Sequence, residues 1–137
     1  MKVCNYYHLM ARHSNKLLTI QVDKIVQRIY DDPINQTWLF IPSDEENYYF
    51  IISKGTGKCL TYCGVDTLLM KNIDNTDSQK WMFKDSNDNF LFIKNKKNNE
   101  CLDVDGMLMG DNVAIITYRY KPRKNENQQW KLLDLIC

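Results

Sequence analysis

The sequence lacks several features that would assign a class of function at once. No apolar run in its 137 residues approaches the roughly 18 residues that a membrane-spanning helix needs, so we expect no membrane insertion. A charge excess is also missing, because 18 basic residues are balanced by 17 acidic ones and leave a net charge of +1. A protein that binds nucleic acid through its phosphates normally has a clear basic excess, so we expect no nucleic-acid partner.

Residue patterns typical of catalysis and metal binding are absent as well. With only five glycines there is no glycine-rich phosphate loop, and no Ser/His/Asp or Cys/His arrangement indicates nucleophilic catalysis. His8 and His13 have no cysteine or carboxylate at metal-binding spacing. We therefore expect no enzyme activity, no metal site and no cofactor.

The N-terminus and the cysteines bear on the compartment. The first residues have no uninterrupted apolar core and no small-residue cleavage site, so no signal peptide is visible. Five cysteines are an odd number, so at least one thiol is unpaired within a monomer, and a cytoplasmic protein with mostly reduced thiols is the simplest interpretation. Release by a non-classical route is the alternative.

What the sequence does contain is a threefold repeat with a period of 42 residues. Aromatic residues recur without a gap at Tyr6, Tyr48 and Phe90. The same interval separates matching aliphatic and turn positions, which are Leu9, Ile51, Ile93, Leu18, Leu60, Leu102, Asn15, Gly57 and Asn99. Asparagine and glycine tolerate positive φ, so each repeat is predicted to open with two strands joined by a tight turn.

Each repeat closes with a Gln-x-Trp motif, at residues 36–38, 79–81 and 128–130. The tryptophan spacings are 43 and 49, so the third repeat has a longer loop before its motif. One repeat of about four short strands cannot cover its own apolar face, whereas three repeats around an axis close a barrel and share a core. We predict one all-β domain over residues 1–137, with the indoles inside and repeats at roughly 1–42, 43–86 and 87–137.

One local pattern conflicts with this prediction. Residues 22–30 carry apolar side chains at helical spacing. The equivalent segments, 67–70 and 114–118, look like strands. We therefore predict a strand in the first repeat too, with a helix over 22–30 as the alternative.

With these motifs the chain resembles the ricin-B-type (R-type) β-trefoil lectins over essentially its whole length. The three Gln-x-Trp motifs and the Cys-Leu-Asp-Val of residues 101–104 carry the resemblance. The repeats also resemble the lectin-like trefoil head of the bacterial binary insecticidal toxins. The resemblance implies a β-trefoil fold and non-catalytic sugar binding at up to three shallow sites, one in each repeat.

The resemblance places a complete sugar site in the third repeat. Asp103 matches the aspartate that binds sugar hydroxyls in the family, and Tyr118 matches the aromatic ring that stacks on the sugar. Asn127 and Gln128 match the amide pair that serves as polar ligand and as support for the aspartate. Gly106 would let the backbone approach the ligand closely. The implied ligands are galactose- or N-acetylgalactosamine-type glycans.

The first two repeats lack this set, because Thr19 and Thr61 replace the aspartate and no aromatic ring follows. We therefore expect one working site, with an affinity on the order of millimolar. Useful avidity would then need a homodimer or a multivalent surface. Two alternatives stay open. One is a protein-binding trefoil, such as a protease inhibitor or toxin-complex subunit, with a vestigial sugar site and a contact loop such as 121–127. The other is a trefoil enzyme or an adaptor to one, which would need a second polypeptide because no catalytic set is visible in this sequence.

The cysteines depart from the family pattern. Ricin-type repeats often carry a disulfide that starts at the equivalent of Cys101 and closes just after the stacking aromatic, where this chain has Arg119 and Tyr120. We therefore interpret Cys59 and Cys101 as small buried hydrophobic residues. A Cys4–Cys137 disulfide stays open, since the termini meet in a trefoil. The basic clusters at 94–97 and 121–124 are expected to be solvated loops.

Overall fold

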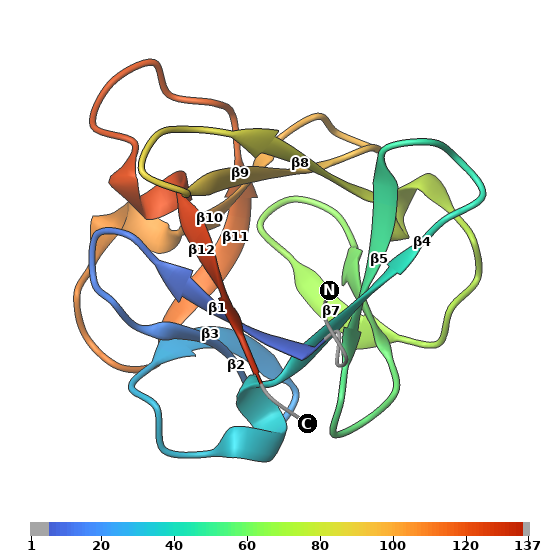
Figure 1. Ribbon diagram of the computed structural model, residues 1–137, viewed down its shortest axis with the longest axis horizontal. Helices are drawn as coiled ribbons and strands as arrows, with labels where there is room; N and C mark the ends of the chain where they lie inside the picture. Colours follow the sequence, from blue (N-terminus) through green and yellow to red (C-terminus); the bar gives the residue numbers. More distant parts are fainter. Residues whose placement is uncertain (1–5, 136–137) are drawn as a thin grey trace.

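The computed structural model describes residues 6–135, which form strands and short 3-10 helices without any α-helix in that range (Figure 1). The first repeat contains β1 (Tyr6–Ala11), β2 (Leu17–Gln21), β3 (Lys24–Arg28), η1 (Pro33–Gln36) and β4 (Trp38–Pro42). The second contains β5 (Tyr48–Ser53), β6 (Cys59–Tyr62), β7 (Leu68–Lys71), η2 (Asp77–Gln79) and β8 (Trp81–Asp85). The third contains β9 (Leu91–Asn95), β10 (Cys101–Val104), η3 (Asp105–Met107), β11 (Val113–Tyr118), η4 (Glu126–Gln128) and β12 (Trp130–Asp134).

Six of these strands close a ring. Antiparallel pairings run from β1 to β4, β5, β8, β9 and β12, and β12 pairs with β1 to complete the barrel. The other six strands form three hairpins, β2–β3, β6–β7 and β10–β11, one from each repeat. A six-stranded barrel with three hairpins is the β-trefoil, so the predicted fold is confirmed.

The tryptophan of each closing motif fills the centre of the barrel. Trp38, Trp81 and Trp130 are fully buried, and they pack with the repeated aliphatic residues in one core. Each indole N–H donates to a backbone carbonyl of its own repeat at 3.0 Å, and the acceptors are Leu18, Leu60 and Leu102. Because a buried indole needs a hydrogen-bond partner, the repeated leucine and the repeated tryptophan are placed as a pair.

The segment with the helical pattern is a strand, as the repeat predicted. In β3, Ile25 and Val26 are buried, and the strand pairs with β2 along its whole length. Val22, Ile29 and Tyr30 lie outside the strand and are exposed. The apolar spacing that suggested a helix therefore mixes core residues with surface ones, and the helix alternative is wrong.

Cys59 and Cys101 are free, fully buried thiols, as expected. Burial raises the pKa of Cys59 to about 12 and that of Cys101 to about 11, because the interior disfavours the thiolate. The Cys4–Cys137 pairing lies outside the described residues.

Candidate functional site

The hairpin of the third repeat borders a pocket of about 360 Å³ that contains four of the five predicted site residues. Asp103, Gly106, Tyr118 and Asn127 all line it. The register of the hairpin explains part of this arrangement, because Asp103 on β10 pairs with Ile116 on β11, two residues before Tyr118. The remaining lining residues are Asp66, Asp105, Ile116 and Lys121.

Asp103 is held by two side-chain amides. Asn127 donates to its Oδ1 at 3.0 Å and Gln128 donates to its Oδ2 at 2.9 Å. The side chain of Asp103 is only 3% exposed, yet it borders an open pocket. Each oxygen keeps a lone pair, so the fixed carboxylate can accept further hydrogen bonds from a ligand.

Gln128 acts below the pocket and does not line it. The second N–H of its amide donates to the carbonyl of Arg119 at 2.8 Å, and its Oε1 accepts the backbone N–H of Lys121. With all its hydrogen-bonding groups engaged and its side chain fully buried, Gln128 serves to orient Asp103. The resemblance implied two roles for the amide pair, polar ligand and support for the aspartate. The hydrogen bonds of Gln128 fit the supporting role.

Asn127 is also largely engaged. Besides Asp103, its amide N–H groups reach the carbonyl of Val104 at 2.9 Å, and its Oδ1 accepts from Lys121 Nζ at 2.8 Å. An ammonium group has three protons, so Lys121 retains donors for a ligand in the pocket that it lines. Lys121 lines the pocket, and the sequence did not predict it there.

The pKa of Asp103 is raised to about 6. Burial is the main cause, since it disfavours the charged form, and Asp105 adds to it. The hydrogen bonds from Gln128 and Asn127 and the positive charge of Lys121 act in the opposite direction. The carboxylate is therefore mostly ionised at pH 7 and titrates just below it.

Tyr118 and Gly106 border the same pocket from opposite ends of the hairpin. The Tyr118 ring is 38% exposed, with the Arg119 guanidinium 5.1 Å from its centroid. Gly106 has a φ of 64°, which glycine adopts at little cost. The loop after it is fixed from the first repeat, because the buried amide of Gln27 donates to the carbonyls of Leu108 and Gly110.

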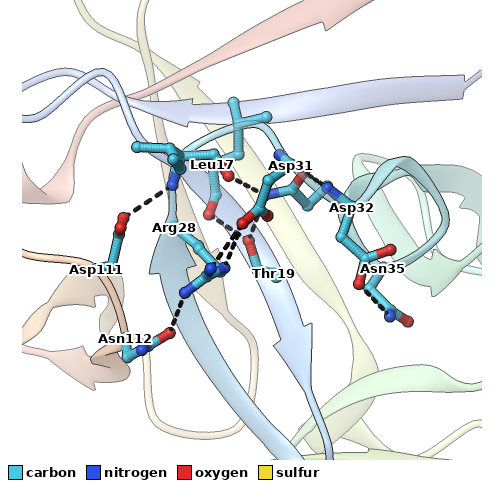
Figure 2. A network of polar contacts seen from close by, with 10 residues as sticks. Leu17, Thr19, Arg28, Asp31, Asp32, Asn35, Asp111 and Asn112 are labelled. Atoms are coloured by element: carbon cyan, nitrogen blue, oxygen red, sulfur yellow. Dashed lines mark hydrogen bonds and ion pairs between the residues drawn. The ribbon is translucent and has the colours of Figure 1, made fainter.

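The first repeat shows what occupies the equivalent place when the site is absent (Figure 2). Arg28 pairs with Leu17 just as Tyr118 pairs with Cys101, so Arg28 stands where the third repeat has its ring. Its guanidinium forms an ion pair with Asp31 at 2.6 Å and donates to Asn112 at 3.0 Å, as Figure 2 shows.

The hydroxyl of Thr19 takes the place of the carboxylate in this repeat. It accepts from Gln36 Nε2 at 3.1 Å and donates to the carbonyl of Leu17 (Figure 2). Thr19, Arg28 and Asp31 all line a hollow in the first repeat, so this hollow has a hydroxyl at the position of Asp103 and an ion pair among its lining residues.

The second repeat also has a threonine at the position of Asp103 and a cation at the position of Tyr118. Thr61 accepts from Gln79 Nε2 at 3.2 Å, and Lys71 stands opposite Cys59 at the position of Tyr118. Hydrogen bonds from the hydroxyl and the backbone N–H of Thr76 are the main cause that lowers the pKa of Asp74, and the positive charge of Lys71 adds to it. The absence of an aspartate and a ring from the first two repeats, predicted from the sequence, is therefore accompanied by a cation and an acid in each.

Neither a metal centre nor a membrane span is found in the described part of the chain. Residues 6–135 contain no group of three or more His, Cys, Asp or Glu side chains that could hold a metal ion. Within the same residues, no helix has the length and apolar character needed to cross a membrane.

Comparisons with known proteins agree with this architecture. A family model described as "Ricin-type beta-trefoil lectin domain-like" matches residues 34–118 and 77–136. The two matches start 43 residues apart, which is the spacing between Trp38 and Trp81, so the model fits in two registers of the repeat. No curated protein sequence matches the chain.

Three solved structures illustrate the similarity. A designed threefold symmetric protein, ThreeFoil, is 27% identical with a TM-score of 0.88, over 96% of this chain and all of that one. A GH43 β-1,3-galactosidase is 26% identical with a TM-score of 0.83, over 95% of this chain but only 27% of the enzyme. SeviL bound to asialo-GM1 saccharide is 19% identical with a TM-score of 0.78, over 95% and 97% of the two chains, and shows the fold alone.

Proposed function

The chain belongs to the ricin-type β-trefoil lectin domain-like family, and on that premise we propose that it is a carbohydrate-binding protein without catalytic activity. Its ligands are galactose- or N-acetylgalactosamine-type sugars, and the binding site is the Asp103 pocket of the third repeat. Asp103 accepts hydrogen bonds from adjacent sugar hydroxyls, and Tyr118 stacks on the apolar face of the ring. Gln128 and Asn127 hold the carboxylate in position.

One observation carries this proposal. Thr19 and Thr61 accept the hydrogen bond from the motif glutamine at the position of Asp103, so the barrel needs only a hydroxyl there. A buried carboxylate costs free energy that a threonine would not. Its presence beside an open pocket, with a tyrosine at the rim, is therefore best explained by a ligand that it binds.

The proposed galactose preference rests on the family and on the relative positions of the carboxylate and the tyrosine ring. An axial hydroxyl places two neighbouring hydroxyls on one edge of the sugar, where the carboxylate can accept from both. The opposite face of the ring then stays free to stack on Tyr118. Because the site is shallow and single, we expect a Kd on the order of millimolar, and avidity would come from a homodimer or a glycan-dense surface.

The test is a titration of the isotopically labelled protein with lactose and N-acetylgalactosamine, followed by NMR, with mannose as the comparison sugar. Asp103→Thr copies the residue of the other two repeats, so it removes the carboxylate and keeps the bond to Gln128. We expect this variant to bind lactose at least about tenfold more weakly while its melting temperature is maintained.

Asp85→Thr is the matched control, since Asp85 is an exposed residue at the end of β8. It should bind lactose like the unmodified protein. Lactose binding that survives Asp103→Thr would move the site elsewhere. No response to any sugar would contradict the lectin function and favour a protein-binding trefoil. Sedimentation of the unmodified protein tests the homodimer.

A further inference from the structure

A second hollow of about 480 Å³ adjoins the sugar pocket and is lined by Lys121, Pro122, Arg123 and Lys124. Lys121 lines both hollows, so the two meet at its side chain. With Arg119 nearby in sequence, four cations fall within residues 119–124, although the whole chain carries a net charge of only +1. A loop with four positive charges therefore borders the pocket.

No salt bridge among the described residues uses these cations, although Lys121 donates to Asn127. Among the described residues, the salt bridges at 4.0 Å or less involve Arg12, Arg28, Lys80 and Lys96, and none involves a cation of residues 119–124. Arg119, Arg123 and Lys124 are exposed. Their charges are available to an anion that a ligand brings.

The threefold comparison shows that this charge is specific to the third repeat. The backbone N–H of Lys121 donates to Gln128 Oε1, whereas in the other repeats acidic residues make the same bond, which are Asp31 and Asp32 in the first and Asp74 in the second. The sign of the charge is thus reversed at one structural position. In the first repeat the acid is neutralised by Arg28, whereas the third repeat has the uncharged Tyr118 at the position of Arg28.

The basic loop contains part of the extra length of the third repeat, and the larger part lies in the connection between β10 and β11. Gln36 and Gln79 lie five positions after Asp31 and Asp74, but Gln128 lies seven positions after Lys121. The longer loop is braced by Asn125, which donates to the carbonyl of Lys121 at 2.8 Å and accepts from Gln129 at 2.9 Å. A loop fixed in this way presents its charges at lower entropic cost on binding.

We propose that the third-repeat site takes galactosides that carry an anionic group, with the galactose in the Asp103 pocket and the anion on the basic loop 119–124. This inference rests on the proposed function. Ammonium and guanidinium groups donate charge-assisted hydrogen bonds to carboxylate and sulfate alike, so a sialic acid or a sulfate ester on the galactose offers the required chemistry.

The test compares three probes by NMR titration at low salt: lactose, sialyllactose and 3′-sulfated lactose. We expect one or both anionic probes to bind about threefold to tenfold more tightly than lactose, with a preference that shrinks as salt is added. Which of the two is preferred distinguishes a carboxylate ligand from a sulfate ligand.

The double variant Arg123→Gln/Lys124→Gln removes two charges of the loop outside the sugar pocket. It should lose the preference for anionic probes and keep the affinity for lactose. The control Lys54→Gln/Lys58→Gln removes the same charge from the exposed turn between β5 and β6 and should keep the preference.

Equal affinity for lactose and for both anionic probes would overturn this inference and leave the proposed function standing. Failure of lactose and of both anionic probes to bind would overturn both. Tight binding of sulfated lactose by Asp103→Thr would show that charge alone holds the ligand, which also contradicts the two-part site.

Discussion

Gln128 donates to Asp103 at 2.9 Å in the same way that Gln36 donates to the hydroxyl of Thr19. One scaffold position therefore receives a fixed amide donor in every repeat, and the residue that accepts from it is a threonine in the first two repeats and an aspartate in the third. In the third repeat this residue is a carboxylate with a pKa raised to about 6.

Sugar binding should depend on pH through Asp103. In the proposed site the ionised carboxylate is the acceptor for the sugar hydroxyls, so the affinity for lactose should be about tenfold lower at pH 5 than at pH 7. Titrations between pH 5 and pH 8 measure this, with near-ultraviolet circular dichroism as the check that the fold persists. A flat affinity over this range would exclude Asp103 as the titrating acceptor.

The Asp103 carboxyl should also make the stability of the fold depend on pH, with the protein more stable at low pH, where sugar binding is expected to be weaker. Its pKa is higher in the folded protein than in the unfolded chain, so its contribution to the free energy of unfolding is present at low pH and is lost as the pH rises through about 6. Relative to Asp103→Thr, the unmodified protein should therefore lose stability between pH 5 and pH 7. Urea unfolding of both proteins at the two pH values measures the difference.

Removing the ring at the pocket rim should weaken binding and spare the fold. Tyr118→Ala is expected to reduce the affinity for lactose about fivefold to tenfold, since stacking contributes about 1 kcal/mol. Because Tyr118 is partly exposed, the melting temperature should change little. Tyr30→Ala, at an exposed ring in the first repeat, is the control and should bind lactose normally. An unchanged affinity in Tyr118→Ala would mean that the sugar does not lie on this ring.

A strained valine offers a test of the threefold geometry. Val22, Gly64 and Gly106 hold equivalent positions and all have positive φ, at 59°, 113° and 64°. Val22 is 93% exposed, so Val22→Gly would relieve backbone strain without losing packing. We expect stabilisation by about 1 kcal/mol in urea unfolding. Asp23→Gly, at a neighbour without positive φ, should give no gain; equal stabilisation by both would point to a cause other than strain.

The buried thiols should resist alkylation. With pKa values raised to about 12 and 11, Cys59 and Cys101 should remain unmodified by iodoacetamide at pH 8, while the partly exposed Cys63 reacts. Peptide mass spectrometry reads the three sites separately, and the unfolded protein in guanidinium is the control in which all three react. Rapid labelling of Cys59 in the folded protein would indicate local opening around β6.

The fold could be predicted because the repeated residues are the ones that make the core. Trp38 and its two equivalents recur together with the leucines whose carbonyls they contact, and this recurrence outweighed a helical pattern at 22–30. That pattern misled because helical spacing does not distinguish core residues such as Ile25 from exposed ones such as Val22.

The sequence predicted the candidate site less completely than the fold. The set built around Asp103 was predicted by resemblance, and four of its five members line one pocket. Lys121 and Asp66 were missed for different physical reasons. Asp66 reaches the pocket from the second repeat, so no local pattern indicates it. Counting back from Gln128 by the interval between Asp31 and Gln36 would have reached Arg123, because the loop of the third repeat is two residues longer, so Lys121 had no sequence register to indicate it.

The pairing of β1 with β12 has a consequence for the order of the chain. Tyr7 lies opposite Asp134 and Ala11 opposite Trp130, so the first and last described strands close the barrel as neighbours. The ring thus has no intrinsic starting point. A circular permutant that joins these two strands through a short linker and opens between β4 and β5 would present the same three lobes, in an order that begins with the second.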